Sequence, residues 1–366
     1  MPDLERLLEL QAECFADDIE FPEAARTWTE AQAREFFNSA GQVVPNGKGD
    51  TTTAKKPELP PLELTAVGSK KRFKAVAPKT FTTTKGIRIA YQLSVVPNSS
   101  APPVVVLGGG QSGRDEACSY GGAEANFFAQ HTVLVFDRRN TCASDFSYED
   151  IGTEPGQVPE NHAQADDTIE LLDSLAPLGP KWLFYGISSG ARLLSLVALR
   201  RPDLVSAFVL NNLTGGHGAA EGLSAAYYST HVDTALRAGM DGVLQAKLYR
   251  KANEASKQRL LAMEVPRFVQ AMRASAGLYF DSKGHPALAL SAADLASIRV
   301  PVIVVNTYGD KNDGAHTPEV AHAVAAAIPG AECVVSDDMK VWLPAIVAFV
   351  ERVSRPTTTT AAIGIS

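Results

Sequence analysis

The sequence has few cysteines and no excess of basic residues, and both absences narrow its function. Its 366 residues include four cysteines that lie far apart, with no C-x-x-C pair among them. Few and widely spaced cysteines argue against a disulfide framework and favour reduced thiols. Because no C-x-x-C pair is present, no metal site is expected. The chain carries 34 Lys and Arg against 41 Asp and Glu, a net charge of −7. Because binding nucleic acid needs clustered basic residues, nucleic acid is not an expected partner. The cysteines are Cys14, Cys118, Cys142 and Cys333.

Long apolar runs and cofactor motifs are also missing. No stretch reaches the roughly 18 consecutive apolar residues of a membrane-spanning helix, so no membrane association is expected. The first residues, MPDLERLLEL, are acidic and lack the basic region and apolar core of a secretory signal. The glycines at 108–110 complete neither a dinucleotide fingerprint nor a phosphate loop. Together these absences predict a soluble, cytoplasmic protein without a cofactor.

The chain is expected to form one large body with appendages. A single hydrophobic core stops growing at about 250–300 residues, so 366 residues fit one α/β domain with additions. Residues 42–66 are rich in Pro, Gly, Thr and Lys without an apolar period, which is typical of a linker. The predicted division is a helical extension at 1–41, a linker at 42–71, an α/β core at 72–212 and 298–354, a helical cap at 213–297, and a flexible tail at 355–366.

The N-terminal extension has two readings. Leu7, Leu8, Phe36 and Phe37 would be exposed without reason if the predicted helices at 3–40 lay free in solvent. They are therefore expected to cover apolar surface of the body or to dock a protein partner.

The body alternates strand and helix patterns, which is typical of a mainly parallel sheet covered on both faces. The segments 72–78 and 86–95 are predicted to open the sheet as an antiparallel pair. Five short apolar runs then end near turn signals, as buried parallel strands do. They lie at 102–110, 131–137, 181–186, 205–211 and 300–306, and the segment 331–337 is predicted to close the sheet. Helices are expected at about 120–129, 161–175, 189–201, 317–328 and 342–353.

The strongest chemical motif is G-x-S-x-G at residues 186–190, between a predicted strand and a predicted helix. In that context a sharp turn holds the serine in a strained conformation and projects its hydroxyl above the sheet. Ser188 is therefore the candidate nucleophile. The backbone N–H of Ser189, at the helix start, is a candidate oxyanion donor. A plain strand-to-helix turn is the alternative.

Glycines at 108–110 follow an earlier strand directly, in LGGGQSGRD. Glycine lets the backbone approach a substrate oxygen closely. Such a loop supplies the second oxyanion donor when it precedes a nucleophile elbow in the sheet. Gly108 and Gly109 are the candidates for that role.

Four stretches resemble the α/β-hydrolase superfamily, in its broad esterase, epoxide-hydrolase and C–C-hydrolase group. They are LGGGQSGRD, FDRRNTCASDF, YGISSGARLLSLVALRRPDLVSAFVLNN and VNTYGDKNDGAHTPEVAHAVAAAIPGAE. The resemblance covers residues from about 85 to 354 and implies an α/β-hydrolase fold: a mainly parallel sheet, helices on both faces and an inserted helical cap. Relatives usually have His where this chain has Leu107, and an R-G-x-G-x-S-D turn where it has Asn140 and Cys142.

The resemblance also implies an acid after the penultimate strand and a histidine after the last one. Asp313 is the preferred acid and Asp310 the second choice, although either one can be a solvated loop carboxylate. After the last strand the chain has Asp337, Asp338, Met339 and Lys340, and no histidine. A serine without a base nearby is a weak nucleophile.

His316 is the predicted base. Thr317 and Pro318 suit the cap and first turn of a helix, which leaves His316 in the preceding loop, at the sheet edge where Ser188 projects. The triad is recognised by geometry and not by chain order. His217 and Lys340 are the alternatives, as is the absence of any base.

Three functions remain open from the sequence. The leading hypothesis is a cofactor-free serine hydrolase of an ester, thioester or lactone, with a small acyl-bearing substrate. The second is a catalytically impaired protein that binds a small ligand or a protein partner. The third is lyase or transferase chemistry on the same fold. Side chains of the cap that are candidates to line a pocket, or simply to pack, are Tyr227, Tyr228, Tyr249, Phe268, Met272, Tyr279 and Phe280.

Overall fold

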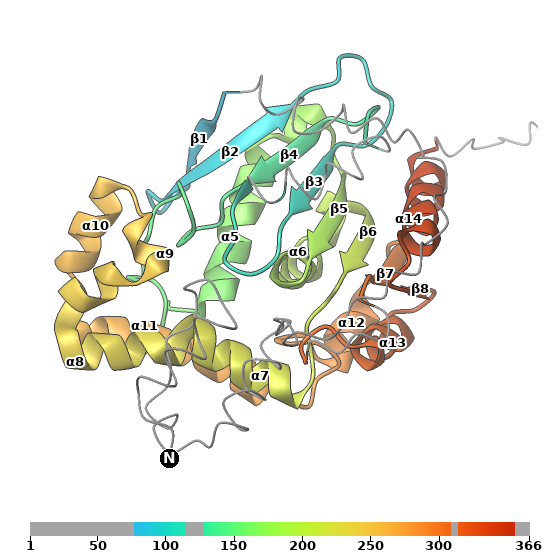
Figure 1. The fold of residues 1–366 in the computed structure, drawn as a ribbon. Helices are drawn as coiled ribbons and strands as arrows, with labels where there is room; N and C mark the ends of the chain where they lie inside the picture. The colour runs from blue at the N-terminus through green and yellow to red at the C-terminus, as the bar shows by residue number, and fades with distance from the viewer. Residues whose placement is uncertain (1–76, 115–116, 118–127, 309–313, 356–366) are drawn as a thin grey trace, which may run out of the picture.

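A computed structural model describes residues 77–114, 117, 128–308 and 314–355. They form an eight-stranded sheet in the order β1-β2-β4-β3-β5-β6-β7-β8 (Figure 1). β1 pairs antiparallel with β2, β2 pairs antiparallel with β4, and the remaining pairs are parallel. The strands are β1 Lys79–Thr82, β2 Arg88–Ser94, β3 Val104–Leu107, β4 Val133–Phe136, β5 Trp182–Ile187, β6 Val205–Asn211, β7 Val302–Asn306 and β8 Glu332–Val335.

Helices cover both faces of the sheet, and the alternation along each strand divides the core. Val105 of β3 packs with the helices of one face, while its neighbours Val104 and Val106 face the other. The first face carries α5 Glu160–Ser174, α6 Ser189–Arg200, α12 Ala292–Ser297 and α13 Pro318–Ala327. The second carries α14 Met339–Ser354, through Ile346, Phe349 and Val350. The fully buried middle strands explain their continuous apolar sequences.

A helical insertion separates β6 from β7. Its elements are α7 His217–Ser224, the π-turn η4 Ala225–Ser229, α8 Thr230–Gln245, α9 Lys247–Arg250, α10 Glu254–Leu261 and α11 Val265–Asp281. In Figure 1, α7, α8 and α11 lie beyond the end of the sheet toward which β5 and β6 point. Tyr249, Phe268 and Met272 build a core of their own there, together with Phe146 and Tyr148 from the chain after β4. The insertion therefore sits over the carboxyl ends of the parallel strands.

The opening strand begins later than predicted. Residues 72–76 of the predicted segment lie outside the described part, and residues 77 and 78 are not in a strand. The partner of β2 is Lys79–Thr82, in register from Lys79↔Tyr91 to Thr82↔Arg88. A short turn fixes that register, because Gly86 donates to the Thr83 carbonyl at 2.9 Å with a positive φ of 79°.

Four predicted segments fall wholly or mainly outside the described residues. The extension at 1–41 and the linker at 42–71 lie there, as does most of the tail at 355–366. The helix expected at about 120–129 is described only from residue 128, where residues 128–130 form a turn. The other predicted helices are present as α5, α6, α13 and α14.

Candidate active site

Ser188 lies at the turn between β5 and α6. Its backbone has φ 53° and ψ −117°, a conformation that residues other than glycine rarely adopt. Its N–H donates to the Asn211 carbonyl of the neighbouring strand β6 at 2.8 Å, which fixes the turn at the carboxyl end of the sheet. The side chain is half-buried. The turn therefore presents a partly accessible hydroxyl at this edge.

Close packing explains the two glycines of the motif. A Cβ on Gly186 would lie 2.4 Å from the Ala191 Cα, and one on Gly190 would lie 2.4 Å from the Leu107 carbonyl oxygen and 2.5 Å from that of Gly108. The start of α6 thus presses on the backbone of the loop after β3. No side chain fits at either position without moving the two segments that surround Ser188.

We expect Gly190→Ala to destabilise the protein by about 2 kcal/mol or more, because its neighbours are backbone atoms that cannot rotate away. Urea unfolding would show a lower midpoint at an unchanged slope. Gly222→Ala in α7 is the control, since a Cβ there meets nothing within 4 Å; it should be neutral or stabilising by about 0.5–1 kcal/mol. Equal midpoints for the two variants would contradict this account of the motif.

His316 contacts the Ser188 hydroxyl, with its Nε2 2.9 Å from Oγ. Asn306, the last residue of β7, holds the loop by donating from Nδ2 to the His316 carbonyl at 2.9 Å. The Tyr308 ring stacks on the imidazole, with centroids 5.3 Å apart. As predicted, Thr317 caps α13 by accepting from the Val320 N–H, and Pro318 is the first helical residue. The strand end, the stack and the cap together position the imidazole.

Two features of this geometry define the fold. The elbow follows β5, one of the central strands. The strand order places β3 between β4 and β5, and β2 is the strand that pairs antiparallel with both of its neighbours. The decisive observation is that a half-buried G-x-S-x-G serine lies at the carboxyl end of such a sheet. The chain has the α/β-hydrolase fold.

Solved structures of α/β-hydrolase fold proteins are similar to this chain. A hydrolase from Pseudomonas aeruginosa PA01 is 20% identical over 75% of this chain and 99% of its own, with a TM-score of 0.49. The esterase RhEst1 from Rhodococcus sp. ECU1013 is 17% identical over 75% of this chain and 99% of its own, with a TM-score of 0.47. The enol-lactonase from Burkholderia xenovorans LB400 is 19% identical over 75% of this chain and 100% of its own, with a TM-score of 0.47. No protein-family model and no curated protein matches the sequence. At these identities the likeness does not bear on the substrate.

The glycine loop after β3 lies against the nucleophile elbow. A Cβ on Gly109 would be 3.0 Å from the Ser188 Cβ and 3.6 Å from its Oγ, so only glycine fits there without displacing the serine. Gly110 has a positive φ of 54°, and its carbonyl accepts from the Ser189 hydroxyl at 2.7 Å. Ser189 is the first residue of α6, where backbone N–H groups have no acceptor within the helix. The structure thus brings Gly109 and Ser189 to the hydroxyl, while the Gly108 carbonyl packs on Gly190.

The alternative bases His217 and Lys340 lie at the protein surface. His217 is 62% exposed and pairs with Glu221 of its own helix at 3.0 Å. Lys340 is exposed in the first turn of α14. Asp310 and Asp313 lie outside the described residues.

The loop after β4 has two non-glycine residues in the left-handed region of backbone conformation. Asn140 and Cys142 stand at the two glycine positions of the R-G-x-G turn, and both have positive φ, 63° and 47°. Asparagine tolerates this region, and here its side chain also donates to Glu160 and accepts from the Ser147 N–H. Asn140 therefore adds side-chain hydrogen bonds to this turn that a glycine could not make.

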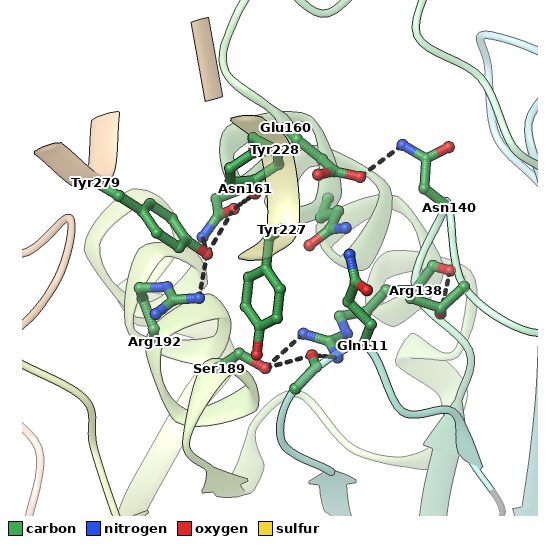
Figure 2. Close-up of a pocket in the computed structure, with 13 residues that line it drawn as sticks. Gln111, Arg138, Asn140, Glu160, Asn161, Ser189, Arg192, Tyr227, Tyr228 and Tyr279 are labelled. Atoms are coloured by element: carbon green, nitrogen blue, oxygen red, sulfur yellow. Dashed lines mark hydrogen bonds between the residues drawn. The ribbon is translucent and has the colours of Figure 1, made fainter. Parts of the chain in front are cut away.

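A polar pocket opens beside Ser189 and Gly110 (Figure 2). Of the side chains named as candidate pocket residues, Tyr227, Tyr228 and Tyr279 line it. Tyr249, Phe268 and Met272 pack in the core of the insertion, and Phe280 is 46% exposed. Sequence reasoning missed the charged and amide residues that line this pocket: Gln111, Arg138, Asn140, Glu160, Asn161, Gln164 and Arg192.

A hydrogen-bond network orders the pocket. The Tyr228 hydroxyl donates to Asn161 Oδ1 at 3.2 Å, and Asn161 Nδ2 donates to the Tyr279 hydroxyl at 3.3 Å. Burial raises the pKa of Glu160 and of Tyr228, because each would be charged in a site shielded from water. Burial also lowers the pKa of Arg138. The pocket is therefore a polar, hydrogen-bonded site and not an apolar slot.

Two further findings concern the described residues alone. The described residues contain no helix that is both long and apolar enough to cross a membrane. They also contain no group of three or more His, Cys, Asp or Glu side chains arranged to hold a metal ion.

Proposed function

We propose that the protein is a cofactor-free serine hydrolase of a carboxylic ester, thioester or lactone. The single observation that carries the proposal is the 2.9 Å contact between His316 Nε2 and Ser188 Oγ at a nucleophile elbow. An imidazole at hydrogen-bond distance can take the hydroxyl proton as the oxygen attacks an acyl carbon. This contact also weakens the case for a catalytically impaired protein, which rested on the missing histidine after β8.

In the proposed mechanism, Ser188 Oγ attacks the acyl carbon while His316 accepts its proton. The backbone N–H of Ser189 and that of the Gly108–Gly109 loop stabilise the tetrahedral oxyanion. His316 then protonates the leaving alcohol or thiol, and the acyl-enzyme is hydrolysed by a water that His316 activates. Asp313 is the proposed acid that orients the imidazole, three residues before it in the chain.

The insertion at 213–297 is the proposed cap, and 72–212 with 298–354 the proposed catalytic core. Tyr227, Tyr228 and Tyr279 come from the insertion and line the pocket beside Ser189. Ligands of open α/β sheets bind outside the carboxyl ends of the strands. A cap in this place would select the substrate and limit the access of water.

Active-site titration with a fluorophosphonate tests the proposal. We expect one covalent adduct per folded chain, mapped by peptide mass spectrometry to Ser188, and none in the denatured protein. Failure to form a stoichiometric adduct would favour a binding protein over a hydrolase.

A further inference from the structure

Two guanidinium groups lie buried in the pocket without a carboxylate partner. Arg138 is 5% exposed and Arg192 is 1% exposed. Within the described ranges, no carboxylate oxygen lies within 4.0 Å of either one. The neighbouring Arg139 is the contrast, because it is just as buried and pairs with Asp167 and Asp150 at 2.5 Å each. A buried charge is costly unless it is paired, so the two unpaired groups need an explanation.

Neutral groups fix the two guanidiniums in place. Arg138 donates to the Ser189 hydroxyl at 2.9 Å and to the Gly110 carbonyl at 2.5 Å (Figure 2). Arg192 donates to the Thr214 hydroxyl at 3.0 Å and to the Tyr279 hydroxyl, and it stacks on the Tyr279 ring at 4.5 Å. In both residues Nε is buried without a hydrogen-bond partner in the described part of the chain. The groups are thus ordered while their charge remains uncompensated.

Glu160 is the acidic side chain among the residues that line the pocket, and it does not cancel this charge. Its carboxylate accepts from Asn140 Nδ2 at 2.6 Å, and burial raises its pKa toward the neutral form. Even a fully ionised Glu160 contributes one negative charge to a pocket lined by two guanidiniums, so the pocket keeps a net positive charge. Arg138 and Arg192 also repel one another, which adds to the lowering of the Arg138 pKa by burial.

The charged pocket lies next to the nucleophile. Ser189 and Arg192 are three residues apart on α6, so they share one face of the helix and differ by about 4.5 Å along its axis. Gly110, the other neighbour of the elbow, also lines the pocket. One small molecule can therefore reach both Arg192 and the Ser188 hydroxyl.

We propose that Arg138 and Arg192 form a subsite for a carboxylate, so that the substrate is an ester, thioester or lactone with a second, ionised carboxyl group. The proposal rests on the hydrolase function proposed above. A carboxylate would pair with both guanidiniums and remove the cost of burying them, and charge-assisted hydrogen bonds are about twice as strong as neutral ones. The Tyr279 hydroxyl adds a polar group beside it.

The first test compares two substrates that differ only in this charge: mono-4-nitrophenyl adipate, with a terminal carboxylate, and 4-nitrophenyl hexanoate, with a methyl group there. We expect the wild-type kcat/KM to be at least about tenfold higher for the adipate ester, after subtraction of the uncatalysed rates. Equal values, or a preference for the hexanoate or for a 6-aminohexanoate ester, would overturn the proposal. The last of these outcomes would assign the pocket to a cation held by Glu160.

Variants then locate the preference. Arg192→Gln should lower the adipate-to-hexanoate ratio about tenfold or more, and Arg192→Lys should retain part of it because the charge remains. Arg273→Gln is the matched control, since Arg273 is exposed on α11, and its ratio should equal that of the wild type. An unchanged ratio in Arg192→Gln, with normal thermal unfolding, would contradict the assignment.

A binding measurement separates this proposal from the hydrolase function. Calorimetry on the full-length Ser188→Ala protein should show mono-4-nitrophenyl adipate binding more tightly than 4-nitrophenyl hexanoate. Arg192→Gln in that background should remove the difference. That result would support the subsite even if neither ester is hydrolysed. Hydrolysis of both esters without any difference in binding would refute the subsite and leave the proposed function standing.

Discussion

Replacing Ser188 by alanine is expected to lower kcat/KM for 4-nitrophenyl esters by about 10³-fold or more. The variant loses the oxygen that lies 2.9 Å from His316 Nε2. The oxyanion donors and the pocket remain, so the small residual rate should reflect these alone. Thermal unfolding should change little, because alanine is smaller and the turn is held by the backbone bond to Asn211.

Ser195→Ala is the matched control for this experiment. Ser195 lies on the same helix, is fully buried, and bonds to the Ala191 carbonyl at 2.9 Å. Its loss should cost about 1 kcal/mol of stability and leave turnover unchanged. Wild-type turnover by folded Ser188→Ala would remove the nucleophile assignment.

Replacing His316 by glutamine is expected to lower kcat by about 10³-fold, with a much smaller effect on KM. An amide can keep a hydrogen bond to Ser188 but cannot accept its proton, so the loss falls on the chemical step. The rate of labelling by the fluorophosphonate should fall in parallel, which links the effect to the nucleophile.

Three further variants decide between His316 and the other bases. His322 lies on α13 and is exposed, so His322→Gln should retain activity. His217→Gln should be equally silent, because His217 pairs with Glu221 at the surface. Lys340→Met should be silent for the same reason of exposure. Full activity in His316→Gln with a loss in any of these three would transfer the role of base.

Local patterns were enough to predict most of the sheet and its helices. The buried strands β3, β5, β6 and β7 are short apolar runs. Runs of this length between turn signals are typical of strands that are buried on both faces of a sheet, so the sequence predicts them directly. The predicted start of β1 was wrong because this edge strand, Lys79–Thr82, carries no apolar run. Its place depends on the turn at Gly86 and on pairing with β2, and not on its own composition.

The sequence alone determined those features of the candidate site that depend on a few adjacent residues. The spacing of Gly186, Ser188 and Gly190 is the elbow, because only glycine fits beside Ala191 and beside Leu107. Thr317 and Pro318 fixed the start of α13 and so left His316 in the loop before it. These interactions act over a few residues, and the order of residue types is sufficient to specify them.

The tertiary structure decided which of several histidines meets Ser188 and what surrounds it. His316 and Ser188 are 128 positions apart, and their contact depends on β5 and β7 ending at the same edge of the sheet. The charged pocket is more distant still from any local pattern, since Arg138, Arg192 and Tyr279 come from a loop, a core helix and the insertion. Burial and charge compensation are properties of the assembled elements, so no reading of one segment could show that two arginines lie together without an acid.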